Sequence, residues 1–369
     1  MNEGATGRRS AAARPDAAPR IPAEAMVAFI ADVFVVEGLP AADAARVAQL
    51  MTEADLTGAD AHGIFRLPQY VRRLRAGGIN KRPDIRVSKT AAATALVDGD
   101  NGMGHLVVGR ATDTAIALAR DSGIGWVGVR RSNHAGTAGL YAAMPAEHGM
   151  IGLYAAVANA NHMAVWGGTE LLLGTNPLGI AVPSGEGPLV LDMATTVVSY
   201  GTVKKYALQG LEMPEGWFVN AKTGEPLTDP KRSAEGLLLP IGGYKGSGLA
   251  IMLGLLAGVL NGAAFGRDVV DFNADDKSET NTGQFVAAID VARFMPLASF
   301  TAEVDRHVRD LHRSKRLPGV EEIRLPGERR RQCRDERSRD GVPLPPALVA
   351  QLDALADEIG VARLAERTA

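Results

Sequence analysis

Cysteine is almost absent from the chain, and this limits both its chemistry and its compartment. The only cysteine in the 369 residues is Cys333. A single cysteine cannot form an internal disulfide or a cysteine-based metal site, and its isolation is typical of a reducing compartment. We therefore expect a cytoplasmic protein without structural disulfides.

A surplus of charge of one sign is also missing. The formal net charge is −2 and the sequence pI is about 6.4. Nucleic-acid phosphates or anionic lipids would require a broad basic face, which this composition does not predict. We expect no nucleic acid and no membrane as partners. The length of 369 residues, 46% of them hydrophobic, is sufficient for a large core and two domains.

No apolar run has the flanks of a membrane span. The longest run, residues 247–266, contains several Gly and Ser residues and is framed by neither a Lys/Arg cluster nor an aromatic belt. We interpret it as a buried helix.

The first residues lack core-forming side chains. Residues 1–22 are mostly Ala, Arg, Pro and Gly, and we expect them to form a disordered tail. The arginines raise the alternative of an organelle-targeting segment, but Glu3 and Asp16 interrupt it and no clear amphipathic helix forms.

The hydrophobic pattern predicts an α/β fold with an additional helical domain. Residues 23–82 have apolar positions three and four apart, which is typical of helices. Short apolar strands then alternate with helices over residues 83–297, and this indicates an α/β domain with a mixed sheet. Residues 298–369 return to helix around a charged loop, "LPGERRRQCRDERSRDG". We expect these end helices to pack on the N-terminal ones, so that both chain ends build one helical domain.

A Rossmann dinucleotide fingerprint is missing as well. The stretch "GIGWVG" has the G-x-G-x-x-G spacing, but here a helix precedes the glycines and a strand follows them. The fingerprint requires the opposite order, because a helix N-terminus must meet the pyrophosphate. A better phosphate candidate is "GGYKGSG", where glycines and Lys245 lead into a long helix. A tight loop beside a buried helix explains the same residues.

Two of the seven histidines stand apart from the others. His134 follows a strand in the glycine-bearing turn "RRSNHAGTAG", and His62 precedes Arg66 by four residues in "DLTGADAHGIFRLPQY". If a helix continues past Gly63, the imidazole and the guanidinium share one side of it, and the guanidinium suits a carboxylate. On spacing alone, a structural role for His62 remains open. No His/Asp/Glu cluster has metal-ligand spacing, and we expect no metal.

Seven separate stretches point to one family. Besides the two histidine motifs they are "WGGTELLLGTNPLGIAVP", "LVLDMATT", "MPEGWFVNAKTGEPLTDP", "GGYKGSGLAIML" and "RLPGE", in this order along the chain. Together they resemble the malate/L-lactate dehydrogenase family, which is distinct from the Rossmann dehydrogenases. Its members include ureidoglycolate and sulfolactate dehydrogenases, 2,3-diketo-L-gulonate reductase and Δ1-piperideine-2-carboxylate reductases.

The resemblance implies a function and a set of site residues. It implies hydride transfer between NAD or NADP and a small 2-oxo acid or cyclic imino acid, in a homodimer or higher homo-oligomer with a non-Rossmann nucleotide-binding domain. His62 matches the proton donor, Arg66 the substrate-binding arginine and His134 a second active-site histidine. The segments that match cofactor contacts are Val190, Leu191, Asp192, Met193, Ala194, Thr195 and Thr196, Tyr244 and Lys245, and Pro326, Gly327 and Glu328.

The chain departs from the family pattern near the expected substrate. Ala61 replaces the usual serine before the histidine, and Thr202 stands where a lysine is usual, with Lys204 and Lys205 close by. Asn161 and His162 replace smaller residues. We therefore place Ala61, Asn161 and His162 with Arg66 among the substrate-contacting residues and expect an unusual, bulkier substrate. Two alternatives follow, namely a specialised biosynthetic intermediate on the same scaffold, or a non-catalytic cofactor-binding relative.

Overall fold

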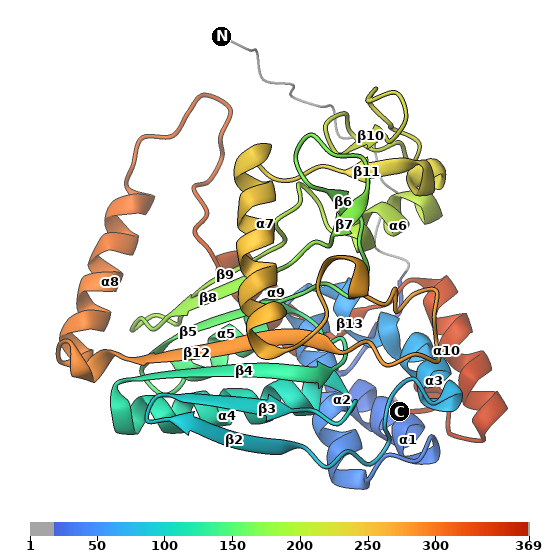
Figure 1. Ribbon diagram of the computed structural model, residues 1–369, viewed down its shortest axis with the longest axis horizontal. Coiled ribbons are helices and arrows are strands. Elements are labelled where there is room, and N and C mark those ends of the chain that lie inside the picture. Colours follow the sequence, from blue (N-terminus) through green and yellow to red (C-terminus); the bar gives the residue numbers. More distant parts are fainter. Residues whose placement is uncertain (1–17, 368–369) are drawn as a thin grey trace.

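The centre of the protein is a seven-stranded mixed sheet (Figure 1). The structure is a computed structural model and describes residues 18–367. The strand order is β2-β3-β4-β12-β5-β8-β9, and β3 with β4 is the parallel pair, while the other neighbours run antiparallel. The predicted α/β fold with a mixed sheet is confirmed. The strands are β2 (Arg86–Ala91), β3 (Thr94–Asp98), β4 (Ile124–Ser132), β5 (Met150–Ala156), β8 (Leu178–Val182), β9 (Leu189–Met193) and β12 (Thr282–Asp290).

Helices cover both faces of this sheet. Because successive strand residues point to opposite faces, Tyr154 and Ala156 of β5 pack with α4 (Gly104–Ser122) and α5 (Ala138–Ala146), while Ala155 packs with α7 (Tyr244–Ala257) on the other face. The helix α4 ends before Gly123, whose φ of 82° lies in the left-handed region, and β4 begins at the next residue. The "GIGWVG" stretch is therefore a helix-to-strand turn, as predicted.

A second core joins the two ends of the chain. It is built from α1 (Ala23–Val36), α2 (Ala41–Leu56) and α3 (Leu67–Ala76) together with α10 (Pro346–Ile359). Apolar side chains such as Phe29, Ile30 and Leu352 are fully buried there, and each contributes about 1.5–3 kcal/mol by its burial. The domain boundaries at residues 82 and 298 stay predictions.

The expected disordered tail ends earlier than predicted. Residues 20–21 form β1 (Arg20–Ile21), which pairs antiparallel with β13 (Val342–Pro343). Ile21 is buried in the core at the chain ends, and this burial explains the ordered strand. The remaining part of the predicted tail, residues 1–17, lies outside the described residues.

Two predictions for the C-terminal region are wrong. The charged stretch after residue 325 is not a loop but contains the helix α9 (Glu328–Asp340), whose arginines pair with acids on other elements. The helix α8 (Leu297–His312) does not pack on α1–α3. It stands at the opposite side of the sheet, where Asp305 accepts hydrogen bonds from the backbone of Gly185 after β8 (Figure 1).

A small lobe lies above the sheet in Figure 1 and is formed by segments on both sides of β9 in the chain. Its core comprises Val203, Met213, Phe218, Leu227 and Leu238. The elements of this part are β6 (Met163–Ala164), β7 (Leu171–Leu173), α6 (Tyr200–Gln209), β10 (Phe218–Asn220) and β11 (Gly236–Leu238).

The apolar run after residue 243 is only half buried. Among the described residues, one segment, Tyr244–Asn261, is long and apolar enough to span a membrane by length and composition, and 44% of it is buried. Ala250, Leu253 and Ala257 of α7 face the protein, whereas Met252 and Leu260 are exposed. The expected buried helix is thus buried on one face and exposed on the other.

Candidate active site

A break in the helix between α2 and α3 positions His62. Two 3-10 turns, Asp60–His62 and Ile64–Arg66, flank Gly63, whose backbone at φ −97° and ψ −137° is not helical. The carboxylate of Asp55 accepts a hydrogen bond of 2.7 Å from the Ile64 N–H. A Cβ atom on Gly63 would lie 2.1 Å from this carboxyl group, so only glycine fits. Burial raises the pKa of Asp55 well above its usual value. The condition of a continuous helix is not met, yet the turns still bring His62 and Arg66 to the same cleft.

Arg66 enters this cleft without an acidic partner. Its Nε donates to the Ala61 carbonyl at 2.8 Å, and its Nη1 donates to Gln69 Oε1 at 3.1 Å. Within the described part of the chain, Arg66 forms no ion pair and Nη2 has no hydrogen-bond acceptor. The guanidinium therefore has donors available for an anion.

His134 is held in a defined tautomer. The Tyr70 hydroxyl lies 2.6 Å from Nδ1, and the Gly136 N–H donates to the same nitrogen at 3.4 Å. Since a backbone N–H only donates, Nδ1 is the acceptor, and the proton of the neutral ring is on Nε2. The ring of His134 stacks on that of His62, with centroids 5.7 Å apart, and on that of Phe272, 5.3 Å away.

Buried hydrogen bonds of the preceding residue, Asn133, hold the loop that carries His134 in place. The buried Asn133 donates from Nδ2 to the Asn101 side chain at 2.9 Å and to the Gly102 carbonyl at 3.0 Å. The hydroxyl of Thr280 donates to Asn133 Oδ1 at 3.1 Å. These contacts give the strand-to-loop turn a single geometry and aim His134 at the cleft.

Both histidines are neutral at pH 7 in the free protein. Burial, followed by the positive charge of Arg66, lowers the pKa of His62 to about 4, while the charge of Asp192 acts in the opposite direction. Burial and the charge of Arg66 also lower the pKa of His134 well below its usual value. The two rings thus act as neutral donors or acceptors until a ligand changes the local charge.

An acidic group stands behind this pair of histidines. Asp192 on β9 accepts hydrogen bonds from the Thr137 hydroxyl and from Arg330 on α9. Arg330 was missed in the sequence, because its segment was interpreted as a loop. Its signal was only the row of arginines, which carries no apolar periodicity.

The cleft gathers side chains from both cores and the small lobe. His62, Arg66, His134 and His162 line it, and its empty volume is about 760 Å³ including the part open to solvent. The ring of His162 stacks on Tyr200 of α6 with 3.8 Å between centroids, and burial lowers its pKa to about 4. Other lining residues, which the sequence did not single out as site residues, are Tyr154, Asn159, Tyr200, Lys204, Phe272, Asn273 and Gln284.

Two predicted substrate residues need correction. Ala61 is not among the lining residues, and its Cβ packs against Gly201, where an added Cβ would be 2.8 Å away. The Asn161 side chain points away and donates to the Gly266 carbonyl at 2.8 Å. Ala61 affects the cleft through its carbonyl, which holds Arg66.

The three predicted cofactor segments lie around β9 and the residues that follow it, and none of their residues is among those that line the cleft. The Val190 N–H donates to the Pro326 carbonyl at 3.2 Å, which places the turn at Gly327 and Glu328 beside the start of the segment Val190, Leu191, Asp192 and Met193. Beyond Ala194, the Ile241 N–H donates to the Thr195 carbonyl at 3.0 Å, and Thr196 pairs with Pro240. Tyr244 and Lys245 follow Ile241 by three and four residues and are exposed at the start of α7.

A buried acceptor in the cleft remains available for a ligand. Gln284 is 1% exposed and its Nε2 donates to the Asn133 carbonyl, whereas its Oε1 has no hydrogen-bond partner among residues 18–367. An unpaired buried acceptor destabilises a protein unless a donor reaches it. A ligand with an amide or hydroxyl donor, such as the carboxamide of nicotinamide, fits this requirement.

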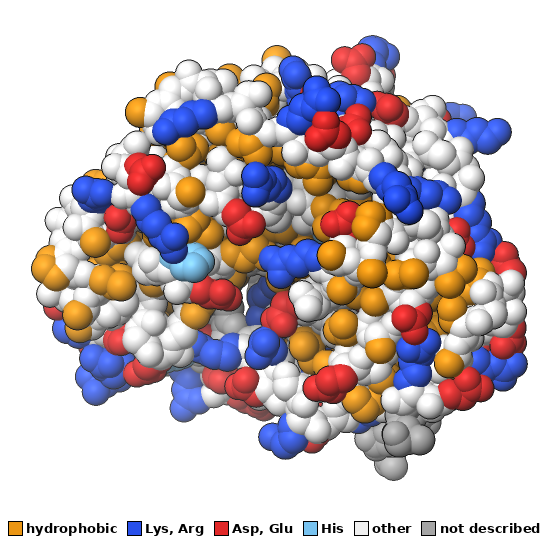
Figure 2. Space-filling view, turned by 90° about the horizontal axis from the view of Figure 1, so that it is seen from below, with side chains coloured by type: hydrophobic (Ala, Val, Ile, Leu, Met, Phe, Trp, Pro, Cys, Tyr) orange, Lys and Arg blue, Asp and Glu red, His pale blue; other side chains and the backbone are white. Residues whose placement is uncertain are grey.

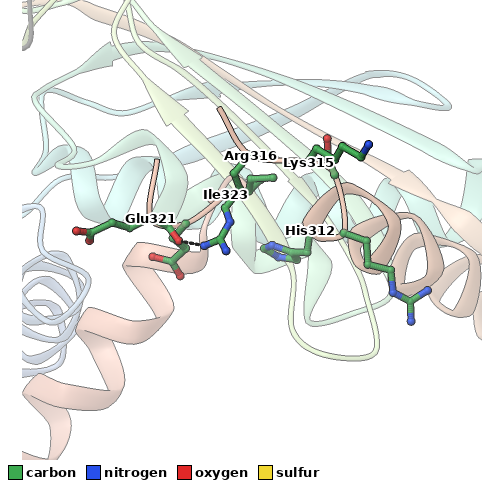
Figure 3. A pocket seen from close by; sticks show the side chains of 8 residues that line it. His312, Lys315, Arg316, Glu321 and Ile323 are labelled. Atoms are coloured by element: carbon green, nitrogen blue, oxygen red, sulfur yellow. Dashed lines mark hydrogen bonds between the residues drawn. The ribbon is translucent and has the colours of Figure 1, made fainter. Parts of the chain in front are cut away.

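A second hollow shares no lining residue with the cleft of His62 and His134. It is open to solvent between the end of α8 and the following loop, and His312, Lys315, Arg316, Glu321 and Ile323 line it (Figure 3). His312 Nε2 and Glu328 Oε1 lie 2.6 Å apart, and Arg316 donates to the Glu321 carbonyl. His312 and Arg316 of this hollow therefore already have partners within the protein. On the face of the molecule in Figure 2, basic and acidic side chains alternate without a broad patch of one sign.

The comparisons with known proteins agree with this architecture. The model of the malate/L-lactate dehydrogenase family matches residues 21–353. The malate dehydrogenase of Pyrococcus horikoshii is 37% identical over 350 residues, covering 93% of this chain and 96% of that protein. The L-sulfolactate dehydrogenase of Methanocaldococcus jannaschii is 37% identical and covers 90% and 95%. The solved structure of the Pyrococcus horikoshii enzyme superposes with a TM-score of 0.87 at 34% identity, over 96% of this chain and 99% of that one.

Two further relatives carry a cofactor in their names. The ureidoglycolate dehydrogenase (NAD(+)) of Escherichia coli K12 is 35% identical and covers 79% of this chain and 82% of that protein. The (2R)-3-sulfolactate dehydrogenase (NADP(+)) of Chromohalobacter salexigens is 33% identical and covers 86% and 92%. Fold and site thus define a non-Rossmann dehydrogenase that acts on CH–OH donors with NAD or NADP. The chain belongs to the malate/L-lactate dehydrogenase family.

Proposed function

We propose that the protein reduces a small 2-oxo acid with NADH or NADPH, and oxidises the corresponding 2-hydroxy acid, in the cleft between His62, Arg66 and His134. The observation that supports this most directly is the unpaired Arg66 guanidinium beside two stacked histidines. A cation with free donors suits a substrate carboxylate, and the imidazoles suit the adjacent oxygen.

His62 is the proposed proton donor and acceptor. In the oxidation direction its neutral ring accepts the proton of the substrate hydroxyl. In the reduction direction its protonated ring donates that proton to the carbonyl oxygen as negative charge develops there. His134 is the second hydrogen-bonding group in this proposal, because its Nε2–H is free to donate once Tyr70 and Gly136 have fixed Nδ1.

Arg66 would orient the substrate. Its Nη2 and the remaining Nη1 hydrogen can bind the carboxylate, and the Ala61 carbonyl and Gln69 keep the guanidinium in place. Such positioning lowers the activation free energy of a reaction between two bound groups. The contribution reaches about 7–11 kcal/mol when the two groups are well oriented.

The nicotinamide cofactor supplies or accepts the hydride when it is bound. We propose that Val190–Thr196, Tyr244 and Lys245, and Pro326–Glu328 hold it, since Pro326 contacts Val190 and the residues just before Tyr244 contact Thr195 and Thr196. The unpaired Gln284 Oε1 supports binding of the carboxamide end near the histidines.

Turnover of the purified protein tests the proposal. NADH and NADPH are each mixed with a panel of 2-oxo acids and cyclic imino acids, and the nicotinamide absorbance is followed. We expect His62→Asn to lower kcat/KM about 100- to 10,000-fold without a change in melting temperature. His148→Asn is the matched control, because His148 is exposed and lies outside the cleft. Activity of His62→Asn equal to the wild type would remove His62 from the mechanism. Activity on cyclic imines alone would assign the alternative substrate class.

We also propose that the active form is at least a dimer. Met252, Leu255, Val259 and Leu260 form an exposed apolar face at α7, with exposed fractions of 57%, 38%, 55% and 63%. Contiguous apolar faces of this kind mark interaction surfaces in soluble proteins. Light scattering after size-exclusion chromatography should give at least twice the chain mass of 38.7 kDa, and Leu260→Glu should reduce it. A monomeric wild type would contradict this assignment.

A further inference from the structure

A second unpaired cation lies in the same cleft as Arg66. Lys204 on α6 lines the cleft and is half-buried there. Its Nζ makes one hydrogen bond, of 3.2 Å, to Asn273 Oδ1, and forms no ion pair with a carboxylate within residues 18–367. An ammonium has three donors, so two remain available.

The surroundings of Lys204 are built rather than incidental. Its Nζ lies 5.6 Å from the centroid of the Tyr200 ring, which in turn stacks on His162. Burial, and then the charge of Arg66, lower the pKa of Lys204, so the free cleft does not compensate its positive charge. Asp271, the acid that acts against this effect, is exposed and accepts hydrogen bonds from Asn273 instead.

The two cations line the same cleft and lie beside consecutive residues of one segment. The Cζ atom of Arg66 lies 5.8 Å from the centroid of the Phe272 ring. The Nζ of Lys204 donates a hydrogen bond to the side chain of the next residue, Asn273. Neighbouring Cα atoms are about 3.8 Å apart, so consecutive residues of one segment contact both cations. A mono-acid would neutralise only one of these charges.

We propose that Lys204 binds a second acidic group of the substrate, so that the cleft selects 2-oxo and 2-hydroxy acids with an additional carboxylate or sulfonate. This inference rests on the proposed function of the same cleft. In this segment the lysine in the cleft is Lys204, whereas position 202, where the family usually has a lysine, carries threonine. The Thr202 side chain instead lies 3.0 Å from the Ser199 hydroxyl at the start of α6 and is absent from the cleft lining.

The preference of the protein for di-acids over mono-acids measures the proposed role of Lys204. Lys204→Met should lower the ratio of kcat/KM for oxaloacetate to kcat/KM for 2-oxobutanoate by about 10- to 100-fold, the range for charge-assisted hydrogen bonds. Lys205→Met is the matched control, because Lys205 is adjacent, exposed and outside the cleft, and it should keep the wild-type ratio. An equal loss for both acids in Lys204→Met would overturn the proposal.

Binding without turnover separates this proposal from the proposed function. The protein loaded with NADH or NADPH is titrated calorimetrically with malate, 3-sulfolactate and 2-hydroxybutanoate, none of which can be oxidised by the reduced cofactor. We expect at least one of the two di-acids to bind about tenfold or more tightly than 2-hydroxybutanoate, and Lys204→Met to abolish the difference. The tighter of the two identifies the second group as carboxylate or sulfonate. Equal affinities in the wild type, no binding of any acid, or an unchanged preference in Lys204→Met would overturn the role of Lys204. Failure of the proposed function would instead show as binding without turnover of any 2-oxo acid.

Discussion

Helix α9 and the cleft are both rich in cations, but they use them in opposite ways. On α9, Arg330, Arg334 and Arg337 pair with Asp192, Glu53 and Asp60, each from another element. In the cleft, Arg66 and Lys204 pair with no acid of the described chain. Removal of a buried cation that has an acidic partner leaves this acid uncompensated in the fold, whereas a cation without a partner in the protein is available to a ligand. The same side-chain chemistry thus marks structure in one region and binding in the other.

The largest effect should come from the most buried pair on α9. Arg330→Met leaves Asp192, 15% exposed, with only the Thr137 hydroxyl as its remaining partner. An unpaired buried carboxylate typically costs about 3–5 kcal/mol, so chemical denaturation should show a loss near the lower end of this range. The double variant Arg330→Met, Asp192→Asn should recover part of the loss. A change of less than about 1 kcal/mol in the single variant would contradict the structural role of this pair.

Arg66→Met should affect binding rather than stability. Removal of this guanidinium leaves no acid behind, so the melting temperature should change little. The substrate carboxylate loses charge-assisted hydrogen bonds, and we expect KM to rise about 10- to 100-fold. Steady-state kinetics with the best substrate of the panel measure this. If Arg66→Met unfolds the protein and Arg330→Met does not, the comparison between the two regions fails.

The pH dependence of stability should report a buried histidine beside the cleft. His105 is 1% exposed and lies edge-on to Tyr70, and neither of its ring nitrogens has a hydrogen-bond partner in the part of the chain that the structure describes. Burial, and then the charge of His62, lower its pKa from 6.5 to about 3. Between these values the unfolded chain binds the proton and the folded chain does not, so the free energy of unfolding falls as the pH falls below 6.5.

The variant His105→Phe isolates this contribution. Phenylalanine keeps the aromatic contact with Tyr70 and cannot titrate. Between pH 6.5 and 5, above the range of most carboxylates, the pH slope of the unfolding free energy should decrease by up to about 1.4 kcal/mol per pH unit. Urea denaturation at several pH values gives the slopes. An unchanged slope would show that His105 takes up its proton in the folded state.

The smallest effect should come from the exposed pair on α9. Arg334 is 50% exposed and its partner Glu53 is 28% exposed, at a distance of 2.7 Å. Solvent and salt screen such a pair, and Arg334→Ala should lower the free energy of unfolding by about 0.2–1 kcal/mol. The loss should shrink further in high salt. A loss as large as that in Arg330→Met would show that exposure does not distinguish the two pairs.

The sequence predicted those elements whose pattern is local. The periodicity around Phe29 and Val47 identified α1 and α2, and the alternation around Tyr154 and Phe285 identified strands of the sheet. The helix α9 was missed because its sequence has no apolar face, and its partners Glu53 and Asp192 lie far away in the chain. Patterns within a short window carry no information about such distant ion pairs.

The site was predicted in part and for partly indirect reasons. His62, Arg66, His134 and His162 do share one cleft, but the argument from helical spacing fails at Gly63. Only the resemblance to a family connected His62 with His134, 72 positions further along the chain. Lys204 and Gln284 enter the cleft because of how α6 and β12 pack, which no local pattern encodes. The roles of the predicted site residues remain predictions until the variants are measured.

The position of Arg66 beside His62 also makes proton and anion cooperative ligands. The charge of Arg66 is, after burial, the second cause that keeps His62 unprotonated. An anion bound at the guanidinium offsets that charge and strengthens the affinity of His62 for a proton. By linkage, a proton on His62 strengthens the affinity for the anion by the same factor. In the reaction proposed above, binding of the acid would therefore favour the protonated His62 that donates the proton.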